Sequence, residues 1–192
     1  LKGLIEIMKT ENDMTQVRNY LEHMQESIDK QDQFIKDIID YSKNKKTKTT
    51  LSKVNLSQII EEAIVQNQYR EEFKRINISK ELNIDSIYSD ELKLKIIINN
   101  ILTNAIKYSD TQKESPFIAI KTYQDKDYIY ISIEDNGIGV KQEYQNKIFD
   151  MFFRASEESY GSGLGLYITK QAIEKIGGKV EEVQSTFGKG TL

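Results

Sequence analysis

The chain has 192 residues, of which 38% are hydrophobic and 30% are charged, a composition typical of a folded protein rather than a disordered one. Its net charge of −3 offers no basic field for a nucleic acid, and the absence of cysteine excludes disulfides and thiolate metal sites. No apolar run approaches the roughly 18 residues that a membrane-spanning helix needs, and no signal-peptide pattern is present.

The first 46 or so residues carry an apolar pattern of helical period. The segment LKGLIEIM places its apolar side chains on one face, and TENDM then interrupts the pattern as a short turn between two helices would. Apolar residues next recur at alternating steps of four and three, a heptad seam that is broken only by Gln31. The seam consists of Val17, Leu21, Met24, Ile28, Gln31, Ile35 and Ile38.

Two helices joined by a short turn form an antiparallel hairpin, and a hairpin with one apolar stripe cannot bury that stripe alone. We therefore predict that a second copy of the chain covers the stripe, which gives a homodimeric four-helix bundle through the N-terminal helices. The alternative is packing of the stripe against the chain's own second domain. The heptad spacing favours the dimer, because such spacing is typical of helix-on-helix contacts.

A polar stretch, SKNKKTKTT, comes next at residues 42–50 and contains four lysines and no apolar residue. It predicts a linker or a frayed helix end, and a solvated hinge is favoured over a nucleic-acid contact. The chain thus divides into a hairpin, residues 1–46, and a second domain, residues 47–192. Because the sequence starts at Leu1 within a helical pattern and stops at GKGTL, we expect a fragment of a longer protein.

From residue 51 onward the pattern indicates a mixed α/β domain. Ser57 is expected to cap a helix through QIIEEAIVQNQYR, Ser89 or Asp90 to open a long apolar-striped helix, and a last helix to begin near residue 163. One sheet with helices on one face makes a two-layer sandwich, so the predicted fold class is α+β: a helical hairpin followed by a two-layer α/β sandwich. Strands are predicted in TLSKVNL, INISKEL, SIYS, FIAIKTY, DYIYISIED, GGKVEEVQS and GKGTL.

The long helix carries a polar face near its end. Asn100 and Asn104 are four residues apart, and Lys107 and Tyr108 come one turn later, so all four share one side. An amide oxygen is a suitable Mg²⁺ ligand, and a lysine one turn away can reach a phosphate. For this helix taken alone, an ordinary solvated face is the better interpretation.

Two glycine-bearing segments come after the predicted hairpin. In EDNGIG, Asp135 at a strand end can accept a hydrogen bond from an exocyclic amine, and Gly137 and Gly139 permit close backbone approach; a common Asn-Gly turn is the alternative. In YGSGLGL, backbone amides at the start of a helix form an anion site, with a flexible loop as the alternative. The residues of that anion site are Gly161, Gly163, Leu164, Gly165 and Leu166.

Taken together and in this order, the segments resemble the boxes of bacterial sensor histidine kinases. NNILTNAIKYS resembles the N box, EDNGIG the first glycine box and KIFDMFFRA the F box, while GSGLGL and STFGKGT resemble the second and third glycine-bearing boxes. The resemblance covers residues 51–192 as the ATP-binding catalytic domain and residues 1–46 as part of the dimerisation and phosphotransfer hairpin. Hsp90, gyrase and MutL share the asparagine and glycine boxes, but the F box and the hairpin favour the kinases.

The resemblance implies a role for each matching residue around Mg²⁺ and ATP. Asp135 would bind the adenine amine, and Tyr108 would pack beside the adenine. Asn104 would ligate Mg²⁺ with Asn100 beside it, and Lys107 would contact phosphate.

The resemblance also implies a mobile lid over the nucleotide, from about residue 140 to residue 160. Arg154, at the end of FDMFFR, would reach the γ-phosphate. Gly161, Gly163 and Gly165 would form the hinge of this lid, in a segment that nucleotide binding orders.

His23, the only histidine, does not fit the role of phosphate acceptor. In the family that acceptor lies on the first hairpin helix, in a box resembling Ser-His-Glu-Leu-Arg-Thr-Pro-Leu, and this chain has no such stretch. His23 lies instead on the second predicted helix, in LEHMQ, while LKGLIEIM resembles the segment directly C-terminal to that box. We therefore expect that the chain starts just after the missing histidine, binds ATP and does not label itself.

The implied activity is transfer of the γ-phosphoryl group of ATP to a histidine and onward to an aspartate of a response regulator, in the cytoplasm, with any membrane attachment outside these residues. Two alternatives remain open. A clamp ATPase of the wider superfamily would use a glutamate on the long helix, where this chain has Asn100. A non-catalytic dimerising or regulator-binding module would not bind Mg-ATP.

Overall fold

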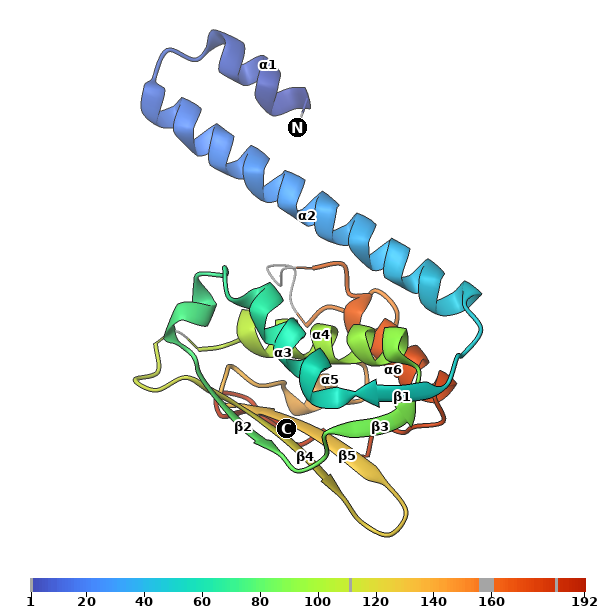
Figure 1. Ribbon diagram of the computed structural model, residues 1–192. Coiled ribbons are helices and arrows are strands. Elements are labelled where there is room, and N and C mark those ends of the chain that lie inside the picture. The colour runs from blue at the N-terminus through green and yellow to red at the C-terminus, as the bar shows by residue number, and fades with distance from the viewer. Residues whose placement is uncertain (1, 111, 156–160, 182) are drawn as a thin grey trace.

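The computed structural model describes residues 2–110, 112–155, 161–181 and 183–192. It begins with a helical arm, residues 2–46, in which α1 (Lys2–Thr10) folds back along the start of α2 (Met14–Lys46) (Figure 1). Asp13 caps α2, because its side chain accepts a hydrogen bond from the backbone nitrogen of Thr15 at 2.8 Å. Two helices joined by a short turn are therefore confirmed. Among the described residues, no helix combines the length and apolar character that crossing a bilayer requires.

The polar stretch that was predicted as a linker or a frayed helix end is partly helical. Helix α2 continues to Lys46, and Thr47 ends it by donating its backbone nitrogen to the carbonyl oxygen of Lys43 at 3.0 Å. Burial explains the extension, because Asn44 is only 2% exposed and its carbonyl oxygen accepts from Lys175 of α6. The linker proper is residues 47–50.

The remaining residues form the sheet domain, residues 51–192. Its elements are β1 (Ser52–Asn55), α3 (Leu56–Asn67), the 3₁₀ helix η1 (Glu72–Arg75), β2 (Asn77–Leu82), β3 (Ser86–Ser89), α4 (Glu91–Lys107), β4 (Phe117–Gln124), β5 (Ile129–Asp135), α5 (Gln142–Gln145), α6 (Gly165–Lys175), β6 (Ser185–Thr186) and β7 (Gly190–Thr191).

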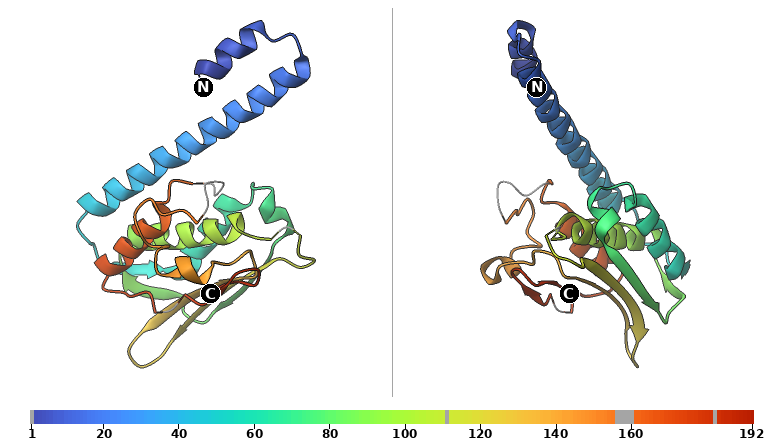
Figure 2. Two further views of the ribbon diagram at one scale, coloured as in Figure 1. Left: turned by 180° about the vertical axis from the view of Figure 1, so that it is seen from behind. Right: turned by 90° about the vertical axis from the view of Figure 1, so that its left-hand side faces the viewer.

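Five strands form one sheet in the order β2-β4-β5-β7-β6, with β2 parallel to β4 and the other neighbours antiparallel. Strands β1 and β3 pair separately. Helices α3, α4 and α6 lie together over one face of the large sheet, as the two orientations in Figure 2 make clear. The predicted two-layer sandwich behind a helical segment is confirmed.

Helix α4 is the centre of the hydrophobic core. Leu102 and Ile106 are fully buried against the sheet, where Ile118 belongs to the same cluster. On another side, Ile97 packs in a second cluster with residues of α6. Because α4 is held from two directions, the position of its last turn is fixed relative to both the sheet and α6.

Two local predictions need correction. Asn55, not Ser57, caps α3: its side chain accepts from the backbone nitrogen of Gln58 at 2.9 Å, and the helix starts at Leu56 because that side chain is completely buried. For α4 the cap is Asp90, one of the two candidates. The strand predicted in GGKVEEVQS is also shorter, since of its described residues only Ser185 lies in a strand, at the edge of the sheet, and Gln184 before it exchanges backbone hydrogen bonds with Leu192.

Candidate functional site

The polar face of α4 points at the segment that precedes α6. The side-chain nitrogen of Asn100 donates to the carbonyl oxygen of Gly165 at 3.2 Å. The ammonium nitrogen of Lys107 lies 3.0 Å from the place where a Cβ at Gly161 would stand. It also donates to the Tyr108 hydroxyl at 3.0 Å and lies 4.6 Å from the centre of that ring. The structure thus brings the predicted asparagine face and the predicted anion site together.

The first glycine turn, residues 136–139, is pressed against the end of α4. A Cβ at Gly137 would overlap the carbonyl oxygen of Tyr108 and lie 2.9 Å from the Asp135 carboxylate, so only glycine fits. Ile138 donates its backbone nitrogen to the same Tyr108 oxygen at 3.0 Å. The Asp135 carboxylate therefore lies close to the turn that packs on the C-terminus of α4.

The third glycine turn, residues 187–190, closes over the first. A Cβ at Gly190 would overlap the carbonyl oxygen of Asp135, and Gly188 donates its backbone nitrogen to Ile138 at 2.7 Å. Gly139, whose backbone packs against Thr186 and Gly190, adopts a left-handed φ of 65°. The sequence prediction named no residue of this turn as part of the site, although STFGKGT carries its signal.

The second glycine segment, residues 161–165, leads into α6 without a side-chain cap. A Cβ at Gly163 would lie 2.6 Å from the backbone of Phe152, whose nitrogen donates to the Gly163 carbonyl at 3.0 Å. Phe152 has the left-handed φ of 66°, which indicates that this contact holds the segment in a strained conformation. Leu164 is buried in the α4–α6 cluster and anchors the start of α6, whereas Leu166 is half-buried.

The predicted lid lies only in part within the described residues. Residues 156–160 fall outside them. In the part before, Val140 donates its backbone nitrogen to the Ser185 hydroxyl at 2.7 Å, and Gln145 donates to the Ser185 carbonyl at 2.6 Å. Arg154 is exposed. Its contact with a γ-phosphate stays a prediction.

Burial raises the pKa of the Asp135 carboxyl above its usual value. The backbone nitrogen of Gly137, which donates to this carboxylate at 2.8 Å, opposes that rise, as do the backbone of Thr191 and the charge of Lys113. Glu134 raises the pKa further. The carboxylate is thus poised to accept hydrogen bonds when ionised, and it loses that capacity at a higher pH than an exposed aspartate does.

The donors around this site fit a nucleotide with a divalent ion held mainly by phosphates. No group of three His, Cys, Asp or Glu side chains among the described residues could hold a metal alone. Asn104 is half-buried on the polar face, and Mg²⁺ characteristically takes one or two protein oxygens with phosphates and water. The glycine segment at the amino end of α6 supplies backbone amides suited to anions.

Known proteins share this arrangement. The family described as "Histidine kinase-, DNA gyrase B-, and HSP90-like ATPase" matches residues 89–192. The sensor histidine kinase GacS of Pseudomonas protegens is 30% identical over 186 residues, which cover 90% of this chain and 20% of GacS. Curated histidine kinases of this kind are much longer, and this chain spans between 13% and 37% of their length.

Two solved structures share the fold over nearly the whole chain. Histidine kinase ThkA in complex with the response regulator TrrA aligns with a TM-score of 0.74 at 22% identity, over 99% of this chain and 54% of that one. Full-length ShkA in complex with AMPPNP aligns with a TM-score of 0.71 at 23% identity, over 95% and 38%. The chain therefore belongs to the histidine kinase-, DNA gyrase B- and HSP90-like ATPases, and it carries the ATP-binding catalytic domain of a sensor histidine kinase behind a helical region.

Proposed function

We propose that this chain is the core of a two-component sensor kinase, which binds Mg-ATP and directs its γ-phosphoryl group to a histidine outside these residues. The observation that carries this proposal is the convergence of two glycine segments on the C-terminal half of α4, with the third packed on the first. Gly137 touches Tyr108, Gly161 approaches Lys107, and Gly165 bonds Asn100. AMPPNP in complex with the similar ShkA supports an adenine nucleotide as the ligand.

In the proposed complex, Asp135 accepts a hydrogen bond from the adenine amine and Tyr108 packs beside the ring. Asn104 ligates the metal, which would neutralise phosphate charge during transfer. Lys107 and Arg154 provide further positive charge for the phosphates. The Lys107 ammonium group uses one of its three donors on the Tyr108 hydroxyl, which leaves donors for a phosphate.

A clamp ATPase is the less favoured alternative. Those enzymes activate water with a glutamate on the long helix, and the corresponding Asn100 has no basic oxygen of that kind. The side-chain amide nitrogen of Asn100 also donates a hydrogen bond to the Gly165 carbonyl oxygen. Phosphoryl transfer without steady hydrolysis is therefore the reaction that this site supports better.

We propose that residues 1–46 are the dimerisation part and residues 47–192 the catalytic domain. On α2, Leu21 and Ile35 of the heptad seam are 50% and 54% exposed, so the chain's own sheet domain does not cover the stripe. A second copy would cover it. The response regulator TrrA bound to the similar ThkA supports a response regulator as the phosphate-receiving partner.

His23 has no catalytic duty in this proposal. Its side chain is 66% exposed, with Nδ1 4.0 Å from the Glu26 carboxylate. It lies 14 residues before Asp37, the residue of α2 that contacts the second glycine segment, a separation of roughly 21 Å along the helix. Incubation with labelled ATP and Mg²⁺ should give no acid-labile phosphate on His23; labelling there would contradict the proposal.

The test of the nucleotide site is calorimetric titration with Mg-ATP. Asp135→Asn should weaken binding by roughly tenfold or more, the effect of losing a hydrogen bond to a charged acceptor. Asp125→Asn at the exposed β4–β5 turn is the matched control and should bind as the parent chain does. Normal affinity in Asp135→Asn would refute the assignment, and no binding by the parent chain would refute the function.

A further inference from the structure

Lys113 lies in the loop between α4 and β4, and the proposed site gives it no role. Its ammonium nitrogen contacts three backbone carbonyl oxygens: those of Asn136, of Gly137 at 3.3 Å and of Gly188 at 3.0 Å. An ammonium group has three donors, and here all three go to the main chain. Lys113 is thus committed to this place and does not act as a free surface charge.

The three carbonyl groups belong to two separate turns. Asn136 and Gly137 are in the first glycine turn, and Gly188 is in the third. Carbonyl dipoles that converge with their oxygens on one point repel each other unless a donor or cation lies between them. The ammonium group supplies that cation, and it fastens the two turns together.

Both turns determine where the Asp135 carboxylate lies. Gly137 donates its backbone nitrogen to that carboxylate at 2.8 Å, and Gly190 of the third turn packs against the Asp135 carbonyl. Asn136 is independently fixed, because its side-chain oxygen accepts from the backbone nitrogen of Phe117 at 2.8 Å. The third turn is also held by the backbone nitrogen of Gly188, which donates to the Ile138 carbonyl oxygen at 2.7 Å, so Lys113 adds a side-chain link to this backbone contact.

We propose that Lys113 is a positioning residue for base recognition: by tying the first glycine turn to the third, it holds the Asp135 carboxylate where it selects adenine over a purine with a carbonyl at position 6. This inference rests on the proposed function. The charge of Lys113 acts in the same direction, because it lowers the pKa of Asp135 against burial and the nearby Glu134, and so keeps the acceptor ionised.

The experiment compares dissociation constants for Mg-ATP and Mg-ITP, since inosine has a carbonyl where adenine has its amine. Lys113→Met should lose roughly tenfold in preference for ATP, because ATP binding weakens while ITP binding changes little. Lys113→Arg keeps the charge and the donors and should restore most of the preference. Lys126→Met at the β4–β5 turn is the control and should match the parent chain.

A second measurement monitors ATP affinity against pH. Loss of ATP binding on acidification should begin at a higher pH in Lys113→Met than in the parent chain, because the remaining influences of burial and Glu134 both raise the pKa of Asp135. A purely structural role of Lys113 would weaken ATP and ITP equally and leave this profile in place.

The outcomes distinguish a failure of the proposed role of Lys113 from a failure of the proposed nucleotide site. If Asp135→Asn abolishes the ATP preference and Lys113→Met leaves it unchanged, the role of Lys113 is wrong and the site stands. Equal weakening for both nucleotides, with an unmoved pH profile, also overturns that role. If Asp135→Asn leaves the preference unchanged, the base assignment itself fails. If Lys113→Met does not fold, the test uses Lys113→Arg. A folded Lys113→Arg that lacks the parent chain's preference for ATP over ITP overturns the inference.

Discussion

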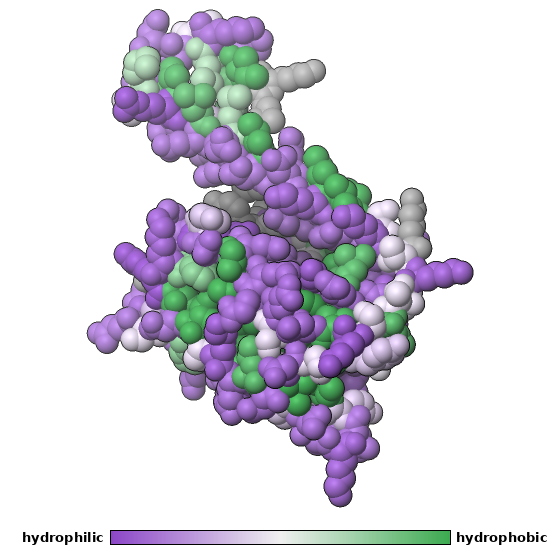
Figure 3. Space-filling model, in the orientation of Figure 1, coloured by the Kyte–Doolittle hydropathy of each residue, from purple (hydrophilic) through white to green (hydrophobic). Residues whose placement is uncertain are grey.

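The helical arm and the sheet domain differ in how far they bury their apolar side chains. In the sheet domain, Ile98 and Leu102 of α4 are fully buried. In the arm, Met14 is 67% exposed and Leu21 50% exposed, and Figure 3 shows apolar patches over both arm helices. The sheet domain completes its own core, whereas the arm presents an apolar surface that something outside this chain must cover.

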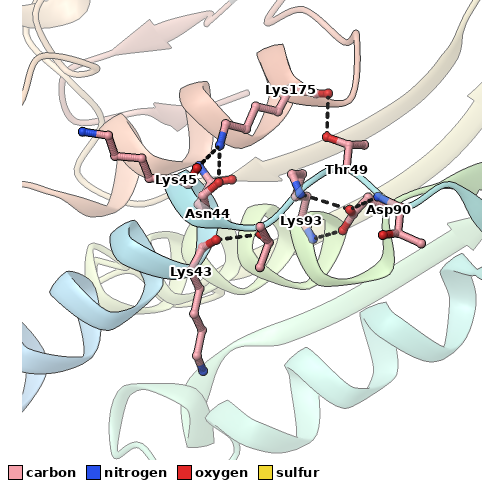
Figure 4. Close-up of polar contacts among 9 residues, drawn as sticks. Lys43, Asn44, Lys45, Thr49, Asp90, Lys93 and Lys175 are labelled. Atoms are coloured by element: carbon pink, nitrogen blue, oxygen red, sulfur yellow. Dashed lines mark hydrogen bonds and ion pairs between the residues drawn. The ribbon is translucent and has the colours of Figure 1, made fainter.

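The junction between the two regions combines an apolar contact, in which Tyr41 of α2 packs on the α4–α6 cluster, with several hydrogen bonds. Figure 4 shows Lys175 of α6 directing its ammonium group at the carbonyl oxygens of Asn44 and Lys45 at the end of α2. Beside it, Asp90 accepts from the linker nitrogen of Thr50 at 2.8 Å and from the buried Lys93 ammonium at 3.0 Å. A small junction that includes hydrogen bonds fixes an orientation and is easier to separate than an apolar core.

The largest effect is expected where the arm meets its partner. Leu21→Asp would bury two carboxylates in each dimer, at a cost of several kcal/mol, and should leave the chain monomeric in sedimentation equilibrium. Asn19→Asp, on the side of α2 away from the seam, introduces the same side chain at an exposed position and should remain dimeric. A dimer that survives Leu21→Asp, or a monomeric parent chain, would remove the need for a covering copy.

Next in size is the contrast between matched isoleucines. Ile98→Ala should cost the sheet domain between about 2 and 5 kcal/mol in free energy of unfolding, because it opens a cavity in a closed core. Ile35→Ala removes the same atoms from a side chain that is 54% exposed and should leave the sheet-domain transition within about 0.5 kcal/mol. Urea titration monitored through sheet-domain amide signals measures both, and equal losses would contradict the comparison.

Asp90→Asn at the junction should destabilise the sheet domain by between about 1 and 3 kcal/mol at neutral pH. Burial alone would raise the pKa of Asp90, but the hydrogen bonds from Thr50 and Lys93 outweigh it and hold that pKa below its usual value. A lowered pKa stabilises the fold above the unfolded value of about 3.9 and ceases to do so as the pH falls through the folded value.

The difference in stability between the parent chain and Asp90→Asn should therefore shrink below about pH 4. Chemical denaturation at several pH values measures it, with Asp127→Asn, on an exposed turn, as the control. A difference that grows on acidification would contradict this assignment of the charge.

The smallest effect is expected at the contact between α2 and the second glycine segment. Asp37 is 7% exposed and accepts from Gln33 at 2.9 Å and from the Ser162 hydroxyl, which in turn accepts from the Leu164 nitrogen at 3.0 Å. Asp37→Ala should loosen this contact by about 1 kcal/mol and speed amide exchange in residues 161–165 roughly fivefold. Asp32→Ala, at an exposed position on the same helix, is the control and should leave amide exchange in residues 161–165 unchanged. Unchanged exchange in Asp37→Ala would show that the arm does not restrain this segment.

Hydrophobic periodicity and the glycine-rich segments were the features from which the main helices, strands and turns could be predicted. The apolar stripe of α4 and the alternation in β4 and β5 were readable because each has one buried face. The polar cluster on α4 came from helical spacing alone. Spacing could not decide which of two capping residues acts: Asn55 and Ser57 can both cap, and the complete burial of Leu56 made the choice.

Contacts across long separations were beyond the sequence. Lys113 stands in a loop with no periodicity, 23 residues before Asn136 and 75 before Gly188. Asn44 lies in a stretch without apolar residues, yet packing under α6 keeps it helical. Such features depend on how the elements meet, and tertiary packing overrode the local signal at both places.

The central claim is that the Asp135 carboxylate and the Asn104 amide serve one Mg-ATP site at the end of α4. A crystal structure of this chain with AMPPNP and Mg²⁺ tests it most directly. We predict the adenine amine within hydrogen-bonding distance of Asp135 and Asn104 among the metal ligands. A nucleotide bound elsewhere, with neither side chain in contact with it or its metal, would contradict the account.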